Sequence, residues 1–169
     1  MPFMARRIEH SAHFPHTVAT LHAAFIDEHY WRAWLQEVGG PGAKLDKVAV
    51  GEGTIDVAMT QSVPAEHLPS MVTKIRPGDL IISRTESWQA LQGARAEGTF
   101  SAKVDGTPGQ LRGTMSLTTD GNGSLLVMEG EVEVKLPVFG SKIESVIAGQ
   151  VIELLDAEKD FTARWTASS

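Results

Sequence analysis

The chain has 169 residues, no cysteine, and fifteen basic against twenty-one acidic side chains, which gives a formal charge of −6. This length predicts one domain spanning residues 1–169, with a core large enough to need no disulfide. The acidic balance argues against nucleic acid as a partner, because phosphates attract basic surfaces. No stretch has the roughly eighteen apolar residues of a membrane span, and the N-terminus lacks the apolar core of a signal peptide. We therefore expect a soluble, cytoplasmic protein.

The chain begins with a predicted strand and two short helices. Residues 4–14 alternate between apolar and polar side chains, as a half-buried strand does. Pro15 suits the first position of a helix, and Asp27 is a plausible N-cap for a second helix. The glycines of residues 39–42 end that second helix. The predicted inward residues are Ile8, His10, Ala12 and Phe14, then Val18, Leu21 and Phe25, then Trp31, Trp34, Leu35 and Val38.

From residue 45 the apolar residues recur with a period of two, which predicts six further strands. Short links between these strands imply antiparallel pairing, and the Asp-Gly-Asn-Gly sequence of residues 120–123 is a strong hairpin signal. Residues 64–78 contain three prolines and are predicted to form a loop with room for one helical turn. This loop either gates the mouth of a pocket or crosses the surface and seals the end of the sheet.

A long helix is predicted after the last strand. Ser141 and Glu144 have the S-x-x-E spacing of a capping box, and a helix from there to Thr166 would be about 40 Å long. Its apolar stripe needs a broad curved partner, which the upstream sheet can supply. Gly149 and Ile152 fall on the predicted outer face. The stripe consists of Ile143, Val146, Ile147, Val151, Leu154, Leu155, Phe161 and Trp165.

This order of elements predicts an α+β fold and resembles the helix-grip fold of the START-like (SRPBCC) superfamily. That superfamily includes polyketide cyclases, dehydrases and lipid-transfer proteins. The Pro-His-Thr-Val sequence of residues 15–18 is similar to the opening of the superfamily's first helix, and residues 25–31 and 84–88 resemble segments of one bacterial branch. The resemblance implies a curved seven-stranded antiparallel sheet around the C-terminal helix, with a pocket for an apolar small molecule or lipid. It supplies no catalytic motif.

The candidate ligand site consists of predicted inward residues, which either line a cavity or fill a solid core. Arg84, Glu86 and Trp88 share one strand face with Leu80 and Ile82. If that face points inward, the ion pair would orient a ligand. In the opposite register, the pair is solvated and the intervening small polar side chains face in. The candidate ligand-binding residues are Val57, Met59, Arg84, Glu86, Trp88, Phe100, Met115, Leu117, Met128, Val132, Val151, Leu154 and Leu155.

The sequence contains no recognisable catalytic or metal-binding motif. Its six histidines lack the H-E-x-x-H spacing, and no G-x-S-x-G nucleophile elbow is present. We therefore expect no metal and no cofactor. The favoured function is binding or transport of an apolar small molecule or lipid. The alternatives are a cyclase- or dehydrase-type enzyme that uses Arg84, Glu86 or a histidine as acid or base, and a protein-interaction module. The oligomeric state stays open.

Overall fold

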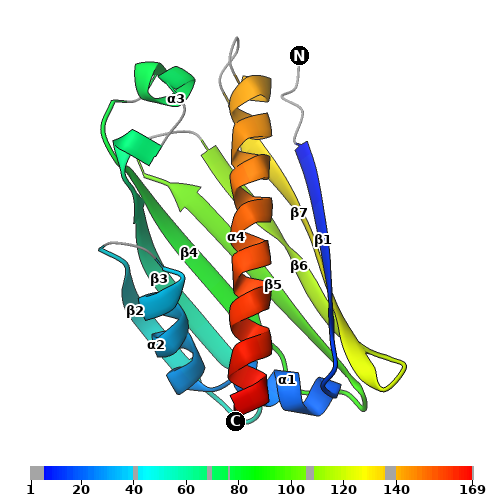
Figure 1. Cartoon of the computed structure of the whole chain (residues 1–169). Helices are drawn as coiled ribbons and strands as arrows, with labels where there is room; N and C mark the ends of the chain where they lie inside the picture. The colour runs from blue at the N-terminus through cyan, green and yellow to red at the C-terminus, as the bar shows by residue number, and fades with distance from the viewer. Residues whose placement is uncertain are drawn as a thin grey trace.

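One curved antiparallel sheet holds a single long helix in its concave face (Figure 1). Two short helices pack near the C-terminal end of this long helix. The predicted order of strand, two helices, six strands and long helix is confirmed, and so is the α+β helix-grip class. The computed structural model describes residues 6–39, 42–67, 70–75, 77–105, 109–135 and 140–168.

The described residues form seven strands, four α-helices and one turn of 3-10 helix. The strands are β1 (Arg6–Phe14), β2 (Lys44–Val50), β3 (Ile55–Val63), β4 (Leu80–Trp88), β5 (Arg95–Val104), β6 (Gly109–Asp120) and β7 (Gly123–Val134). The helices are α1 (Val18–Phe25), α2 (Glu28–Glu37), the 3-10 turn η1 (Ala65–His67), α3 (Ser70–Ile75) and α4 (Gly140–Ser168).

Neighbouring strands of the sheet are also neighbours in sequence, except at β1. This strand pairs with β7, so the order is β1-β7-β6-β5-β4-β3-β2, and every pairing is antiparallel. The helices α1 and α2 carry the chain from the β1 edge to the β2 edge. The predicted hairpin joins β6 to β7, and Gly121 there has a φ of 59°, a left-handed conformation that glycine adopts readily.

Polar side chains cap the two short helices, because the first amides of a helix have no partner within it. Asp27 accepts a hydrogen bond of 2.9 Å from the His29 amide, which confirms the predicted N-cap of α2. The predicted start of α1 is wrong. Its N-cap is Thr17, whose Oγ1 accepts from the Thr20 amide at 3.2 Å, so Pro15 lies before the helix. A threonine hydroxyl can satisfy this amide, whereas a proline ring cannot.

The start of α4 is tied to the sheet through a buried acidic side chain. Glu144 accepts a hydrogen bond of 2.8 Å from the Val134 amide at the end of β7. The other half of the predicted capping box needs the Ser141 side chain, which lies outside the described side chains. Gly149 faces outward as predicted, since an added Cβ would meet nothing within 4 Å. Ile152 was also predicted to face outward, and this prediction is wrong. Its side chain is half-buried and packs against the core, because a curved sheet covers a wider arc of a helix than a flat sheet does.

The segment between β3 and β4 is more helical than the predicted loop. It contains both η1 and α3, and it lies beside the end of the sheet near the start of α4 (Figure 1). The Ala65 amide donates to Asp79 Oδ1 at 2.8 Å, which joins the two ends of the segment. None of its described residues lines either of the internal cavities under α4.

Candidate functional site

The long helix lies closer to one side of the concave face than to the other. It makes most of its sheet contacts with β1 and β7, so the inner faces of β4, β5 and β6 are covered less closely. A cavity of about 110 Å³ lies between these strands and α4. Its apolar wall consists of Ile82, Phe100, Ala102, Val104, Leu111, Met128, Ile147, Val151, Leu154 and Leu155, and its polar residues are Gln61, Arg84, Glu86, Ser101 and Gln110.

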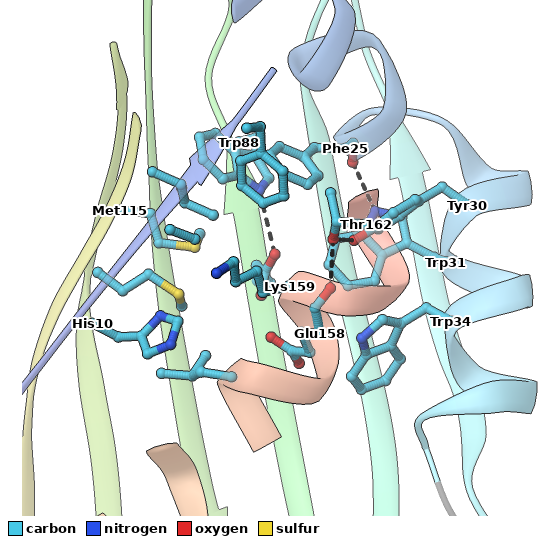
Figure 2. A pocket seen from close by; sticks show the side chains of 16 residues that line it. His10, Phe25, Tyr30, Trp31, Trp34, Trp88, Met115, Glu158, Lys159 and Thr162 are labelled. Carbon is cyan, nitrogen blue, oxygen red and sulfur yellow. Dashed lines mark hydrogen bonds between the residues drawn. The ribbon is translucent and has the colours of Figure 1, made fainter. Parts of the chain in front are cut away.

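A second cavity of about 30 Å³ lies toward the C-terminal end of α4 (Figure 2). Aromatic side chains from α1, α2 and β4 fill most of the space there. The rings of Phe25 and Trp88 are stacked with their centroids 4.9 Å apart, and the Tyr30 ring lies 5.3 Å from that of Phe161. Glu86 borders both cavities, so its carboxyl group stands where the two spaces approach each other.

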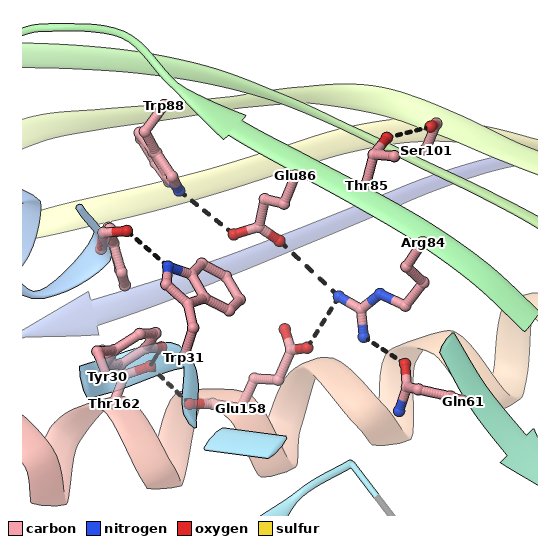
Figure 3. A network of polar contacts seen from close by, with 11 residues as sticks. Tyr30, Trp31, Gln61, Arg84, Thr85, Glu86, Trp88, Ser101, Glu158 and Thr162 are labelled. Atoms are coloured by element: carbon pink, nitrogen blue, oxygen red, sulfur yellow. Dashed lines mark hydrogen bonds and ion pairs between the residues drawn. The ribbon is translucent and has the colours of Figure 1, made fainter. Parts of the chain in front are cut away.

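Arg84 is the centre of a polar cluster at the wall of the larger cavity (Figure 3). Its Nη1 donates to Gln61 Oε1 at 2.9 Å, and its Nη2 donates to Glu158 Oε1 at 3.2 Å. The same Nη2 lies 3.8 Å from Glu86 Oε1. The guanidinium carbon lies 4.9 Å from the centroid of the Trp34 ring, within the range of a cation–π contact. Contacts from β3, from α4 and from the Trp34 ring therefore fix the position of the Arg84 guanidinium.

Glu86 is a buried carboxyl group with few hydrogen-bond partners. Only 7% of the residue is exposed, and its Oε2 accepts from Trp88 Nε1 at the long distance of 3.3 Å. Burial raises the pKa of Glu86, and the negative charge of Glu158 raises it further. Arg84 and the Trp88 hydrogen bond lower it in part, and the resulting pKa is about 7. This group can therefore exchange a proton near neutral pH.

A second set of hydrogen bonds holds the acidic turn of α4 in place. The Thr162 hydroxyl donates to the Glu158 carbonyl oxygen at 2.7 Å, and the Tyr30 hydroxyl is 2.8 Å from Thr162 Oγ1. Burial raises the pKa of Tyr30 far above its ordinary value, so its hydroxyl keeps its proton. On the other side of the cluster, Gln61 Nε2 donates to the Gly39 carbonyl at 3.0 Å. The polar side chains around Arg84 are thus anchored to backbone groups of α4 and of the α2–β2 connection.

The structure decides which face of β4 is buried. Arg84, Glu86 and Trp88 point inward, whereas Thr85 and Ser87 lie on the outer face. The outer hydroxyls have partners of their own, since Thr85 lies 2.6 Å from Ser101 Oγ and Ser87 donates to Asp56 at 2.5 Å.

The thirteen candidate ligand-binding residues all belong to the inner layer, but they do not form one site. Four of them line neither cavity, because helices pack directly on their parts of the sheet: α4 on β7, α1 on β6, and α2 over β2 and β3 (Figure 1). These four, Val57, Met59, Leu117 and Val132, are buried core. Trp88 and Met115 line the smaller cavity. Those that line the larger cavity are Arg84, Glu86, Phe100, Met128, Val151, Leu154 and Leu155.

Sequence reasoning missed the residues that complete the polar cluster. Glu158 lies four residues after Leu154 and three before Phe161, so it occupies the apolar stripe of α4. A charged residue on an apolar stripe was a detectable signal. Gln61 shares the inner face of β3 with Val57 and Met59, but one amide on an apolar strand face carries no comparable signal.

The described residues contain no group of three or more histidine, aspartate and glutamate side chains placed to hold a metal ion. Among the helices that the structure describes, none is long and apolar enough to cross a membrane.

The sequence has relatives over almost its whole length. Residues 9–166 match the family described as "Protein of unknown function (DUF2505)". Uncharacterised proteins of Mycobacterium tuberculosis and Mycobacterium bovis are 31% identical to it over 173 residues, which cover 98% of this chain and 99% of theirs.

Solved structures with the same fold are more distant in sequence. The ZhuI aromatase/cyclase from Streptomyces sp. R1128 has a TM-score of 0.61 at 13% identity, covering 97% of this chain and 94% of that one. A START superfamily protein from Mycobacterium smegmatis has a TM-score of 0.52 at 14% identity, covering 96% and 97%. The protein Ara h 8.0201 has a TM-score of 0.58 at 12% identity, covering 98% and 100%. The chain therefore belongs to the DUF2505 family, and its fold is of the START-like type that the sequence resembled.

Proposed function

We propose that this protein binds a small apolar molecule in the cavity between α4 and the strands β4, β5 and β6. The observation that carries the proposal is an internal space of about 110 Å³ with a mostly apolar wall and one polar corner at Arg84 and Glu86. Ligand sites commonly combine apolar walls with a few fixed polar groups. Burial of apolar surface would supply the affinity, at about 25 cal/mol per Å², less the entropic cost of binding.

The size of the space limits the class of guest. An engineered apolar cavity of about 150 Å³ binds benzene, so a space of about 110 Å³ suits a molecule on the scale of one small ring. A lipid chain is larger than this space of about 110 Å³. Lipid binding or transport would need α4 to move away from β4, β5 and β6, with which it makes fewer contacts than with β1 and β7.

Filling the cavity tests the proposal. Toluene is expected to shift the amide NMR signals of residues around the cavity, and Ala102→Leu is expected to weaken its binding at least tenfold, because three added carbon atoms occupy part of the space. The matched control is Ala58→Leu, which adds the same bulk to the outer face of β3. No toluene binding to the unchanged protein, or equal binding to both variants, would contradict the proposal. Native mass spectrometry would show any apolar compound that copurifies.

Acid–base catalysis on a hydrophobic substrate is a second candidate function. It is favoured by the position of Glu86, a buried carboxyl group at the wall of both cavities with a pKa raised to about 7 by burial and by Glu158. A general base needs a pKa near the working pH and a substrate atom within hydrogen-bond reach. The ZhuI structure, which shares this fold, is named as an aromatase/cyclase, and this supports an enzymatic role for the chain.

Deuterium exchange at the α-carbon of acetophenone in heavy water tests this second candidate. If Glu86 acts as the base, exchange should accelerate as pH rises through about 7 and should be lost in Glu86→Gln. Glu97→Gln, which changes an exposed glutamate on the next strand, should leave it unaltered. Exchange that is the same in both variants would exclude Glu86 as the base for this substrate.

A further inference from the structure

We infer that the cavity selects apolar molecules that carry a hydrogen-bond donor, a hydroxyl or an ammonium group, and that it rejects carboxylates. The inference rests on the proposed binding function and adds the chemistry of the ligand's polar end. It follows from the charges of the Arg84 cluster and from the unused acceptor capacity of the Glu86 carboxyl group.

The positive charge of the Arg84 guanidinium is already shared by two neighbouring carboxyl groups. One nitrogen donates to Gln61, another to Glu158 with Glu86 nearby, and the flat face covers the Trp34 ring. Among the described residues that line the larger cavity, Arg84 is the one cation. A carboxylate ligand would have to share this guanidinium with Glu86 and Glu158, and a third negative charge in a region largely removed from water would be unfavourable.

The carboxyl group of Glu86, by contrast, has acceptor capacity to spare. Its Oε1 is 3.8 Å from Arg84 Nη2, beyond hydrogen-bond distance, and its Oε2 accepts only the 3.3 Å bond from Trp88. Each carboxylate oxygen can accept two hydrogen bonds. A ligand hydroxyl or ammonium group near Glu86 would supply the missing donor to a group that borders both cavities.

The charge of the cluster favours the same class of ligand. Two carboxylates, Glu86 and Glu158, share the single guanidinium of Arg84, so the cluster has a negative charge when both are ionised. An ammonium group would neutralise that charge, whereas a ligand carboxylate would add to it in a region largely removed from water.

Other titratable groups face this region from β1, α2 and α4. His10 borders the smaller cavity and pairs with the exposed Asp156 at 2.9 Å, Lys159 is exposed at the edge of that cavity, and Tyr30 stays protonated. Glu86 borders both cavities, and its pKa is raised to about 7 by burial and by Glu158. Binding of an ammonium ligand should therefore strengthen as pH rises through about 7. Binding of an alcohol should change less, because a protonated carboxyl group can still accept from a hydroxyl.

Four probes of similar size separate these contributions: toluene, benzyl alcohol, benzylamine and benzoate, titrated by NMR at pH 8. We expect the alcohol and the amine to bind about tenfold more tightly than toluene, and benzoate about tenfold more weakly. In Glu86→Gln the advantage of benzylamine over toluene should disappear. Glu97→Gln, at an exposed glutamate, should reproduce the unchanged protein.

Each outcome decides a separate point. Benzoate binding as tightly as toluene, or equal benzylamine affinity in Glu86→Gln and the unchanged protein, would overturn the inference while the apolar cavity function stands. Binding of benzyl alcohol but not benzylamine would restrict the donor to a neutral hydroxyl and would remove the charge argument. If none of the four probes binds, the proposed function itself fails. The comparison of probes uses the unchanged protein, so it does not depend on whether a variant folds.

Discussion

Arg84→Met is expected to lower the free energy of unfolding by about 3 kcal/mol or more at pH 8, the usual loss when one partner of a buried ion pair is removed. The exposed fractions of the Arg84, Glu86 and Glu158 side chains are 12%, 8% and 16%. Without the guanidinium, both carboxyl groups would stay buried with no counter-charge. Urea denaturation followed by tryptophan fluorescence would measure the loss, which should be smaller at pH 5, where Glu86 is protonated.

Another Arg-x-Glu sequence in the chain provides the control. Arg95 and Glu97 form an ion pair of 3.0 Å on the outer face of β5, with side chains 52% and 63% exposed. Exposed pairs contribute about 0–1 kcal/mol, so Arg95→Met should remain close to the unchanged protein. Adding Glu158→Gln to Arg84→Met should recover part of the loss. Equal effects of Arg84→Met and Arg95→Met would show that the Arg84 cluster contributes no more than a surface pair.

Glu86→Gln is expected to stabilise the protein at pH 8 and to flatten the dependence of its stability on pH. The pKa of Glu86 rises from 4.5 to about 7 on folding, through burial and the charge of Glu158. Below pH 4.5 the carboxyl group is protonated in both the folded and unfolded protein, so its pKa difference has no effect. Between pH 4.5 and 7 the folded protein binds the proton more tightly, so stability falls as pH rises through this window. Above pH 7 the accumulated loss is about 3 kcal/mol.

The measurement is the free energy of unfolding at several pH values from 4 to 9, for the unchanged protein, Glu86→Gln and Glu97→Gln. Glutamine has nearly the shape of a protonated glutamate and does not titrate, so the Glu86→Gln profile should lack the fall between pH 4.5 and 7. The profile of Glu97→Gln should run parallel to that of the unchanged protein. Parallel profiles for all three proteins would mean that Glu86 ionises in the folded state as easily as in the unfolded chain.

The expected effects of Arg84→Met and Glu86→Gln concern function as well as stability. A carboxyl group that destabilises the folded protein at neutral pH is a recurrent feature of binding and catalytic sites, where stability is commonly lost in exchange for activity. Glu86 is such a carboxyl group, and it borders both cavities. The buried position of Glu86 at these cavities supports both ligand binding and acid–base chemistry as functions of this site.

The order of the elements could be predicted from the sequence because each signal is local. Alternation with a period of two marks the strands, the i, i+3, i+4 stripe marks α4, and Asp120 to Gly123 have the turn chemistry of a hairpin. The inward residues of β3 and β7 follow from the same alternation, since the charged side chains of both strands lie on the outer face and most apolar side chains lie on the inner face. Strand bounds were predicted to within a few residues, and the start of α1 was wrong because Thr17 competes with Pro15 as the local signal.

Only the tertiary structure decided where the candidate site lies. The sequence contains Arg-x-Glu three times, beginning at Arg7, Arg84 and Arg95. The pair of β5 points outward because small residues, Ala96 and Gly98, occupy the inner positions of that strand. In β4 the alternate residues are polar on both faces, so alternation could not choose between them. The inward direction of Arg84 depends on Gln61 and Glu158, which are 23 and 74 residues away in sequence. The cavity is the space left over where α4 contacts β1 and β7 more closely than the middle strands, and no periodicity along the chain encodes such a difference in packing.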